Sequence, residues 1–303
     1  MAESIIECVA NCSEGRKAET IQALADAINS VKGVSLLDRH HDNDHHRCVF
    51  TFVGIPDAVA QAAFALVKTS TELIDLRQHA GQHPRIGATD VLPFIPLDGE
   101  TMYQCVELAK KVGKRIGDEL RIPVFLYEEA CNQPFRKPLE VIRRGGLSSL
   151  AARMKSDPAW SPDFGPAKLH PSAGAIAVGA RHLLIAFNIV LDTNDLTLAQ
   201  AIAKTIRTSG GGLPAVKALG LELKSRGLVQ VSMNLTNFHM TPLHVVFEAV
   251  RTEAERRGVS IANSELVGLI PQEAVTQAVA NYLKCESLAS DRILETRLRR
   301  CQS

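Results

Sequence analysis

The sequence predicts an α/β (α+β) protein built from two subdomains, each a ferredoxin-like α/β unit. Short apolar runs alternate with amphipathic stretches along the chain, and their order, β-α-β-β-α-β, occurs twice. The two copies are separated by a polar segment at 157–179 that is rich in Pro and Gly, as inter-domain connections are. We therefore predict subdomains at 1–179 and 180–303. Each sheet would keep one face uncovered by its own helices, so facing sheets would bury both faces and leave a cleft.

In the first half, strands are predicted at 4–9, 34–38, 47–53, 91–97 and 123–127. A helix at 17–31 ends before Gly33, a residue suited to helix C-termini. The next helix begins at Pro56, which is favoured in a first turn, and carries small apolar residues along one face. Two further helices are predicted at 101–120 and 139–154.

In the second half, a buried-type strand is predicted at 182–191 and a helix at 196–207, which ends before the glycines at 210–212. Strands follow at 216–222 and 228–235. Thr241 and Pro242 begin a helix, and Leu243, Val246 and Val250 lie on its apolar stripe. A strand near 266–270 and a helix at 272–283 complete the pattern.

The bulk composition excludes several classes of protein. The chain has 303 residues, a formal net charge of +1 and 34 basic against 33 acidic residues, which argues against a general nucleic-acid binder. The seven cysteines contain no CxxC pair, so we expect reduced thiols in a cytoplasmic protein. We find no secretory signal and no apolar run long enough for a membrane span.

The stretch His79–Asp90, "HAGQHPRIGATD", is the first candidate for chemistry. It is a long connection with little helical or strand periodicity, yet it carries His79, His83, Arg85 and Asp90. Imidazole suits acid–base work near neutral pH, and the guanidinium fork of Arg85 can hold a carboxylate through two bonds. Asp90 is a candidate for orienting a histidine or for pairing with Arg85. The alternative is that both histidines pack for structural reasons.

The second candidate is "DRHHDNDHHR" at 38–47, which holds four histidines and three aspartates. These residue types can bind a divalent metal, although their spacing matches no known helical motif. The alternative is a solvated turn from which one or two residues reach into the cleft. We take Asp42, Asp44 and His45 as orienting candidates and Arg47, with Arg85, as a candidate for binding a substrate carboxylate.

The third candidate is "DFGPAKLHPSAGAIAVGAR" at 163–181. Small side chains in it would let the backbone approach a flat ligand closely. It contains neither GxxxxGK[ST] nor GxGxxG, the glycine spacings of two common nucleotide-binding motifs. The alternative interpretation of this stretch is a domain linker.

Together these stretches resemble the formiminotransferase family. The resemblance rests on "ECVANCSEGR", "CVFTFVG", "LIDLRQHAGQHPRIGATDVLPFIPL", "PVFLYEEA", the 163–181 stretch, "LIAFNI" and "QVSMNLTN", which occur in order from residue 5 to 283. It implies two α/β subdomains whose sheets face each other across a folate tunnel, commonly as a homodimer. It also implies transfer of the formimidoyl group of N-formimino-L-glutamate to N5 of tetrahydrofolate, with release of glutamate, in histidine degradation. Some family members carry a second, cyclodeaminase domain; here we expect that activity on a separate protein.

The resemblance also assigns residues. The family's catalytic histidine corresponds to His83, which would act as general acid and base without a metal or redox cofactor. The folate-binding segment corresponds to Gly165, Pro166, Ala167, Lys168, Leu169, His170, Pro171, Ser172, Ala173 and Gly174. Within it, Lys168 and His170 are placed to meet the anionic glutamyl tail; the alternative is that either side chain faces solvent. The chain departs from the family at Ala10 (usually Pro), Cys12 (usually a bulkier apolar residue) and His46 (usually Asn).

Three alternatives stay open at this point. One is a folate-binding module that has lost or altered its transfer activity. Another is a metal-dependent hydrolase built on His40–His46. The third is a transferase whose donor is formylglutamate or formiminoglycine.

Overall fold

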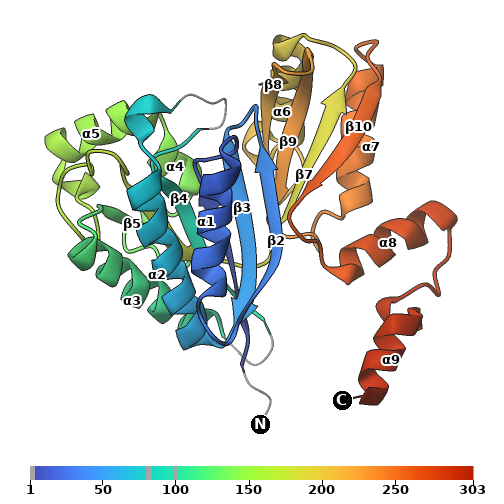
Figure 1. The fold of residues 1–303 in the computed structure, drawn as a ribbon. Coiled ribbons are helices and arrows are strands. Elements are labelled where there is room, and N and C mark those ends of the chain that lie inside the picture. The colour runs from blue at the N-terminus through green and yellow to red at the C-terminus, as the bar shows by residue number, and fades with distance from the viewer. Residues whose placement is uncertain (1–3, 80–83, 98–100, 303) are drawn as a thin grey trace. The chain divides into compact units, whose positions relative to one another are not determined.

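A computed structural model describes residues 4–79, 84–97 and 101–302 of the chain (Figure 1). The chain divides into two compact units, Met1–His182 and Leu183–Ser303.

The first unit is built on one six-stranded sheet with the strand order β2-β3-β1-β4-β6-β5. The first four strands in this order are antiparallel, whereas β4, β6 and β5 run parallel. The strands are β1 (Ile6–Cys12), β2 (Val34–Asp42), β3 (Arg47–Gly54), β4 (Thr89–Pro96), β5 (Val124–Glu128) and β6 (Ile176–Ala180).

Helices pack against both faces of this sheet over separate apolar cores, and on the second face they cover the part built from β4, β5 and β6. The larger core lies beneath α1 (Ala18–Asn29), α2 (Pro56–Leu73) and α3 (Met102–Glu119). Alternate side chains of β5 and β6 point to the opposite face, where a smaller core packs against α4 (Leu139–Arg143) and α5 (Gly146–Ser156). Short 3₁₀ turns occur at η1 (Leu76–Gln78), η2 (Pro134–Arg136) and η3 (Pro158–Trp160).

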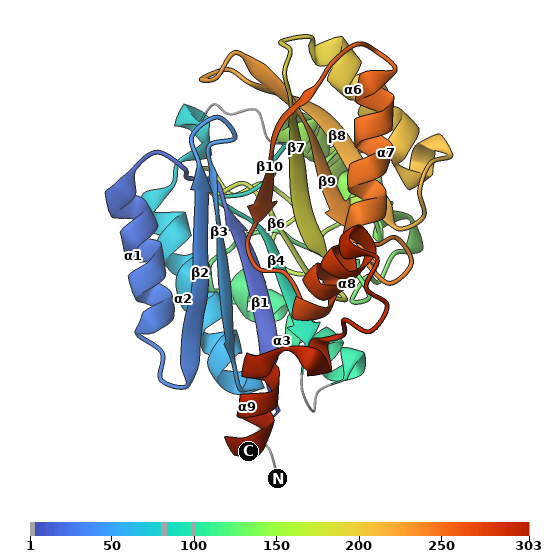
Figure 2. The same cartoon turned by 90° about the vertical axis from the view of Figure 1, so that its right-hand side faces the viewer.

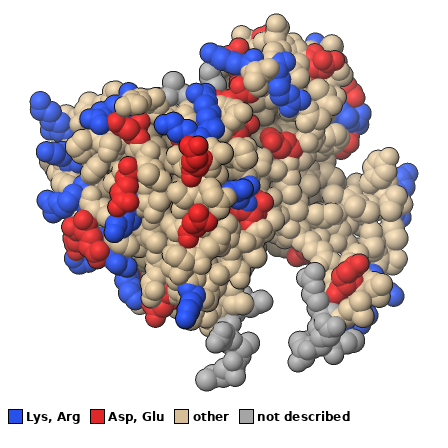
Figure 3. Space-filling view, viewed as in Figure 1, with Lys and Arg blue, Asp and Glu red and all other residues tan. Residues whose placement is uncertain are grey.

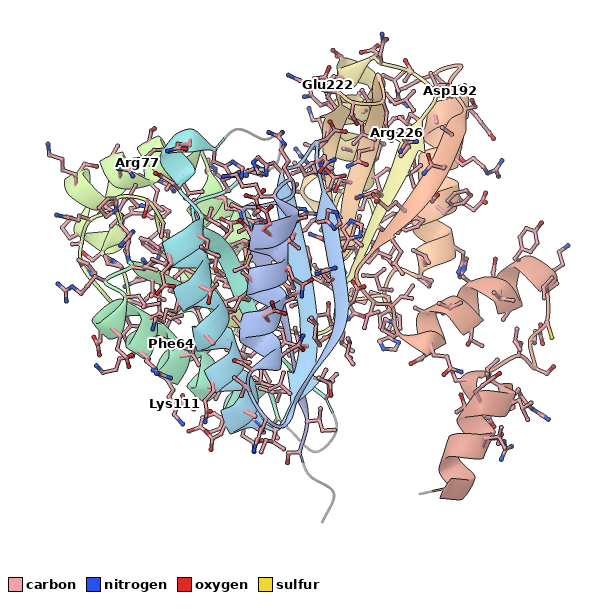
Figure 4. The ribbon with its side chains drawn as sticks, viewed as in Figure 1. Phe64, Arg77, Lys111, Asp192, Glu222 and Arg226 are labelled. Atoms are coloured by element: carbon pink, nitrogen blue, oxygen red, sulfur yellow. The ribbon has the colours of Figure 1, made fainter. Side chains whose placement is uncertain are left out.

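Charged side chains bridge the outer helices of this unit. The guanidinium of Arg115 on α3 lies 3.7 Å from the ring centroid of Phe64 on α2, and Lys111 Nζ lies 3.0 Å from Asp57 Oδ1 (Figure 4). The ion pair is exposed, so it adds little to stability. The apolar faces beneath it hold α2 and α3 in place.

The second unit has an antiparallel four-stranded sheet with the order β10-β7-β9-β8 (Figure 2). Its strands are β7 (Ile185–Leu191), β8 (Val216–Leu223), β9 (Leu228–Leu235) and β10 (Ile261–Val267). Its helices are α6 (Leu196–Ile206), α7 (Leu243–Glu255), α8 (Gln272–Leu283) and α9 (Leu294–Gln302), with 3₁₀ turns η4 (Thr208–Gly210) and η5 (Ser290–Arg292). The helices α6 and α7 cover the core of this sheet.

The predicted repeat is confirmed in space as well as in order. The first six elements of each unit run β-α-β-β-α-β, and the strand orders β2-β3-β1-β4 and β10-β7-β9-β8 place equivalent strands at equivalent positions. The facing of the sheets and the tunnel stay predictions.

Several local predictions were wrong. The end of the 157–179 segment forms the buried strand β6, which was not predicted, and the first compact unit ends at His182. The helix predicted at 139–154 is interrupted because Gly145 and Gly146 both adopt positive φ (75° and 66°). The strand predicted near 266–270 lies at Ile261–Val267, and α9 was not predicted.

Positive and negative side chains are interspersed on the molecular face shown in Figure 3, in keeping with the balanced composition. Within the described residues, no helix combines the length and apolar character that crossing a bilayer requires.

Candidate active site

Four chain segments meet at one edge of the six-stranded sheet. The end of β1 lies beside the starts of β3 and β4, since β1 is antiparallel to both, and the start of β6 lies beside that of β4. The adjoining segments 13–15, 43–46, 84–88 and 170–175 therefore collect at this edge. We call these four segments the loop edge.

Backbone hydrogen bonds join the loop-edge segments. The N–H of Ser13 donates to Ala88 O (2.7 Å), and its hydroxyl donates to Gly87 O (2.7 Å). Ala88 N–H in turn donates to Ala173 O (2.9 Å). At Gly15, an added Cβ would lie 2.2 Å from Asp42 O, so only glycine allows this close approach to the turn after β2. The edge is therefore a single packed structure.

The turn between β2 and β3 is fixed by Asp42. Its carboxylate accepts hydrogen bonds from the N–H of His45 (2.5 Å) and from His45 Nδ1 (2.8 Å). Burial alone would raise the pKa of Asp42, but these bonds and the charges of His45 and Arg47 lower it to about 2. Asp42 thus orients His45 within the protein's own turn.

His46 completes the turn in an uncommon backbone conformation. Its φ is 50°, in the left-handed region that non-glycine residues rarely adopt. Its Nδ1 accepts the N–H of Gly15 (3.1 Å) and lies 3.4 Å from a carboxylate oxygen of Glu14. The same Glu14 oxygen accepts the N–H groups of Arg16 and Lys17, which precede α1 (2.8 and 3.0 Å). The start of α1 and the turn are thus held together.

Arg85 contacts this turn through both terminal nitrogens. Nη2 donates to His45 O (2.8 Å) and Nη1 donates to His46 O (3.1 Å). Nη1 also lies 2.7 and 2.6 Å from the two ring nitrogens of His79, and His79 Nε2 lies 3.2 Å from His46 O. The rings of His46 and His79 stack with centroids 3.9 Å apart. These three side chains form one cluster, Arg85–His79–His46.

The electrostatics of the cluster favour an anionic ligand. Burial, Arg143 and Arg16 lower the pKa of Arg85 to about 10, against the opposing charge of Asp90. Burial, Arg85 and His46 lower the pKa of His79 to about 4, so its ring is neutral at physiological pH. Since a nearby anion would stabilise the buried guanidinium, a carboxylate is a suitable ligand for this cluster.

Asp90 is bound by other partners than those predicted from the sequence. One of its oxygens accepts the N–H of Ile86 (2.6 Å), and the other forms an ion pair with Arg143 on α4. Asp90 therefore holds the 84–88 segment in place, and its charge opposes the lowering of the Arg85 pKa.

The segment 165–174 ends in a tight turn whose small residues have an internal explanation. His170 and Gly174 exchange backbone hydrogen bonds (2.8 and 3.1 Å), and His170 Nδ1 accepts the N–H of Ala173 (3.0 Å). Gly174 has a φ of 72°, and an added Cβ would lie 2.4 Å from Ile86 O. The sequence suggested that close approach of a ligand requires glycine here, but the protein's own backbone already does. Lys168 is exposed, and burial lowers the pKa of His170.

The histidine-rich stretch does not form a separate loop. Strand β2 extends to Asp42, so His40 and His41 lie on a strand, and the turn is confined to 43–46. Among the residues that the structure describes, no three His, Cys, Asp or Glu side chains are grouped as metal ligands would be.

Comparison with known proteins identifies the family. A family model described as "Formiminotransferase domain, N-terminal subdomain" matches residues 5–181, and one described as "Formiminotransferase domain" matches residues 186–298. The chain belongs to the formiminotransferase family.

Individual relatives agree over nearly the whole chain. A glutamate formimidoyltransferase from Streptococcus pyogenes serotype M1 is 45% identical over 282 residues, covering 93% of this chain and 94% of that protein. A glutamate formimidoyltransferase from Thermoplasma acidophilum is 44% identical and covers 97% of both chains. A formimidoyltransferase-cyclodeaminase from Rattus norvegicus is 43% identical over 94% of this chain but only 53% of its own length.

For this formiminotransferase, the loop edge gathers most of the predicted site residues. Arg85 and His45 belong to its segments, and Asp42, Arg47 and Asp90 lie at the adjoining strand ends of β2, β3 and β4. His83 lies outside the described residues, but His79 and Pro84, which bracket that segment, are described. The sequence interpretation missed Glu14 and Arg143. The sequence signal for Glu14 was a carboxylate three residues before Lys17, the N-cap of α1.

Proposed function

We propose that this chain is a glutamate formimidoyltransferase, which transfers the formimidoyl group of N-formimino-L-glutamate to N5 of tetrahydrofolate. The observation that carries this is the similarity to two proteins of that name over almost their full lengths. The buried guanidinium of Arg85 in the Arg85–His79–His46 cluster supports it, because the donor carries two carboxylates. We further propose that the enzyme acts in histidine degradation.

In the proposed reaction, N5 of tetrahydrofolate attacks the amidinium carbon of the donor. A C–N bond to N5 forms, N5 loses its proton, and the glutamate nitrogen gains one as its bond to that carbon breaks. We assign this proton transfer to His83, because one imidazole can accept the first proton and donate the second. Holding both substrates in contact supplies a further part of the rate.

Arg85 is the proposed anchor of a donor carboxylate, with Arg47 as the second candidate. The guanidinium of Arg85 is held by two neutral carbonyl oxygens and a neutral histidine ring, which fix its plane. Burial strengthens the attraction of the Arg85 guanidinium for an anion such as a donor carboxylate.

The segment 165–174 is the proposed folate site, with Lys168 and His170 as the residues that meet the glutamyl tail. Since Gly174 is packed against Ile86 O, the recognition we propose rests on these two side chains and on the exposed part of the segment. Tetrahydrofolate serves as co-substrate.

A direct assay tests the proposal. Purified protein is supplied with tetrahydrofolate and N-formimino-L-glutamate, and both 5-formimidoyltetrahydrofolate and glutamate are quantified. We expect equimolar products, and we expect activity to survive a chelator. Folate binding without turnover would favour the binding module; loss of activity in chelator with recovery on adding zinc would favour the hydrolase. Faster turnover of formylglutamate or formiminoglycine would reassign the donor.

The proposed cellular setting is the cytosol, where thiols such as those of Cys8, Cys12 and Cys48 would stay reduced. We also propose a homodimer, which sedimentation analysis would test, and a separate cyclodeaminase that consumes the product.

A further inference from the structure

The carbonyl oxygen of His46 is contacted by two side chains of the loop edge and its neighbourhood, those of Arg85 and His79. It accepts a hydrogen bond from Arg85 Nη1 and lies within hydrogen-bond distance of His79 Nε2, and the His46 ring stacks on His79. The preceding carbonyl, that of His45, accepts Arg85 Nη2. Two consecutive backbone carbonyls thus hold the two ends of one guanidinium.

This convergence depends on the backbone conformation of residue 46. In an extended strand, consecutive carbonyls point to opposite sides, so they would not reach the same group. The left-handed φ of His46 (50°) turns its peptide so that both oxygens face Arg85. Asparagine and glycine tolerate this conformation, whereas a β-branched side chain does not.

We propose that His46 is a positioning residue for donor binding. Its left-handed backbone aims the carbonyls of residues 45 and 46 at Arg85, and its ring holds His79 against the same guanidinium. The orientation of Arg85, and with it the affinity for a donor carboxylate, is therefore set by the side chain at position 46. This inference rests on the proposed role of Arg85 in binding the donor.

Substitutions at position 46 test the backbone requirement. Asparagine in His46→Asn still tolerates the left-handed φ. Glycine in His46→Gly also tolerates it but removes the ring, whereas valine in His46→Val disfavours this φ. We expect the KM for N-formimino-L-glutamate to change less than threefold in the Asn variant and to rise at least tenfold in the Val variant, with Gly between them. The kcat and the KM for tetrahydrofolate should stay within twofold. The same order is expected for donor Kd by isothermal titration.

Arg121→Val is the matched control. Arg121 is exposed, lies between α3 and β5, and has a similar left-handed φ of 57°. It should lower thermal stability as His46→Val does while leaving the donor KM unchanged. An equal rise in donor KM for both Val variants would reduce the effect of His46 to general destabilisation and overturn the proposal.

A double-mutant cycle with Arg85→Lys tests whether position 46 acts through Arg85. Lysine lacks the planar fork that lets Arg85 donate to the carbonyls of residues 45 and 46 from two nitrogens. We therefore expect His46→Val to raise the donor KM by less than twofold in the Arg85→Lys background. The same fold increase in both backgrounds would overturn the proposal. Absence of wild-type turnover would instead defeat the proposed function. In that case the donor Kd and the urea unfolding midpoints of the wild type, the two single variants and the double variant would still show, by their non-additivity, whether the two positions are coupled.

Discussion

Arg85 could be identified from the sequence as a polar side chain in a loop, and the structure adds the partners that fix its orientation. Its terminal nitrogens are bound by two carbonyls of the β2–β3 turn and by a histidine that is neutral because its pKa is about 4. A point charge could not satisfy these partners at once, because the carbonyls sit at the two ends of a planar fork.

Arg85→Lys should therefore raise the KM for the donor by about tenfold or more and leave folate affinity unchanged. Steady-state kinetics with each substrate varied would measure this. Arg77→Lys is the matched control, because Arg77 is a nearby exposed residue whose ion pair with Asp75 lies outside the cluster (Figure 4). If only Arg47→Lys raised the donor KM, the anchor would be Arg47.

His83→Ala should lower kcat by at least about 100-fold while tetrahydrofolate still binds, since positioned proton transfer contributes about 10²–10⁴-fold. Single-turnover kinetics and a folate titration would separate the two effects. Near-normal turnover in this variant would remove His83 from the mechanism.

The titration of His79 predicts how stability depends on pH. Its folded pKa, about 4, lies below the unfolded value near 6.5, so the unfolded chain binds more protons between these values. Stability from the neutral ring is complete above pH 6.5 and is lost as pH falls toward 4. Relative to His79→Gln, the wild type should lose unfolding free energy by up to about 1.4 kcal/mol per pH unit in this window.

Urea unfolding of both proteins at several pH values would measure this difference. The pKa of Asp42 shifts from 3.8 to about 2 on folding. Asp42 therefore changes the stability mainly below pH 4, outside the range in which His79 acts. A constant difference between wild type and variant from pH 7 to 4 would show that His79 does not have the lowered pKa.

At the scale of elements, the 165–174 segment combines a glycine that is fixed by packing with an exposed lysine. Gly174 faces Ile86 O and has positive φ, whereas Lys168 is exposed on the same segment. A change at the first position should act on stability, and one at the second on the ligand.

Gly174→Val should lower the free energy of unfolding by at least about 2 kcal/mol, since strain and a backbone clash combine. Lys168→Ala should leave stability unchanged and weaken tetrahydrofolate binding by a few-fold, because one exposed charge–charge contact is lost. Thermal unfolding and isothermal titration of both variants would show this; a stable Gly174→Val protein with normal folate affinity would contradict it.

The elements predicted well were those with an apolar periodicity sustained over many residues or with a clear residue signal at one end. The helix at 272–283 matches α8 to the residue, and α3 begins after its predicted residue Thr101, whose side chain caps it. Strand β6 was missed because five small or apolar residues, IAVGA, carry no alternation and follow a Pro- and Gly-rich segment. The break in the helix at 139–154 needed the φ values of two glycines, which the sequence does not fix.

The residue types of the site were predictable, but their partners were not. Arg85 and Asp90 could be identified as candidates because both lie in a polar loop between apolar elements. That Asp90 pairs with Arg143 follows from α4 packing near the start of β4, and the bonds of Arg85 follow from strand register. Contacts between positions so far apart in the chain depend on the assembled sheet.

At the scale of the whole molecule, the repeated unit explains where the site can form. Both units share the strand order of a ferredoxin-like sheet, but only the first extends it with β6 and β5. The loop edge uses this extension, because the 170–175 segment leads directly into β6 and bonds the 84–88 segment.

The position of β6 also has a consequence for synthesis of the chain. Strand β6 lies between β4 and β5 in the sheet, although the ribosome completes both of them first. Until residues 176–180 emerge, the facing edges of β4 and β5 have no strand between them and their backbone groups are open to pairing with another chain. A nascent chain paused in this interval would therefore expose more unpaired strand edge than the finished sheet does.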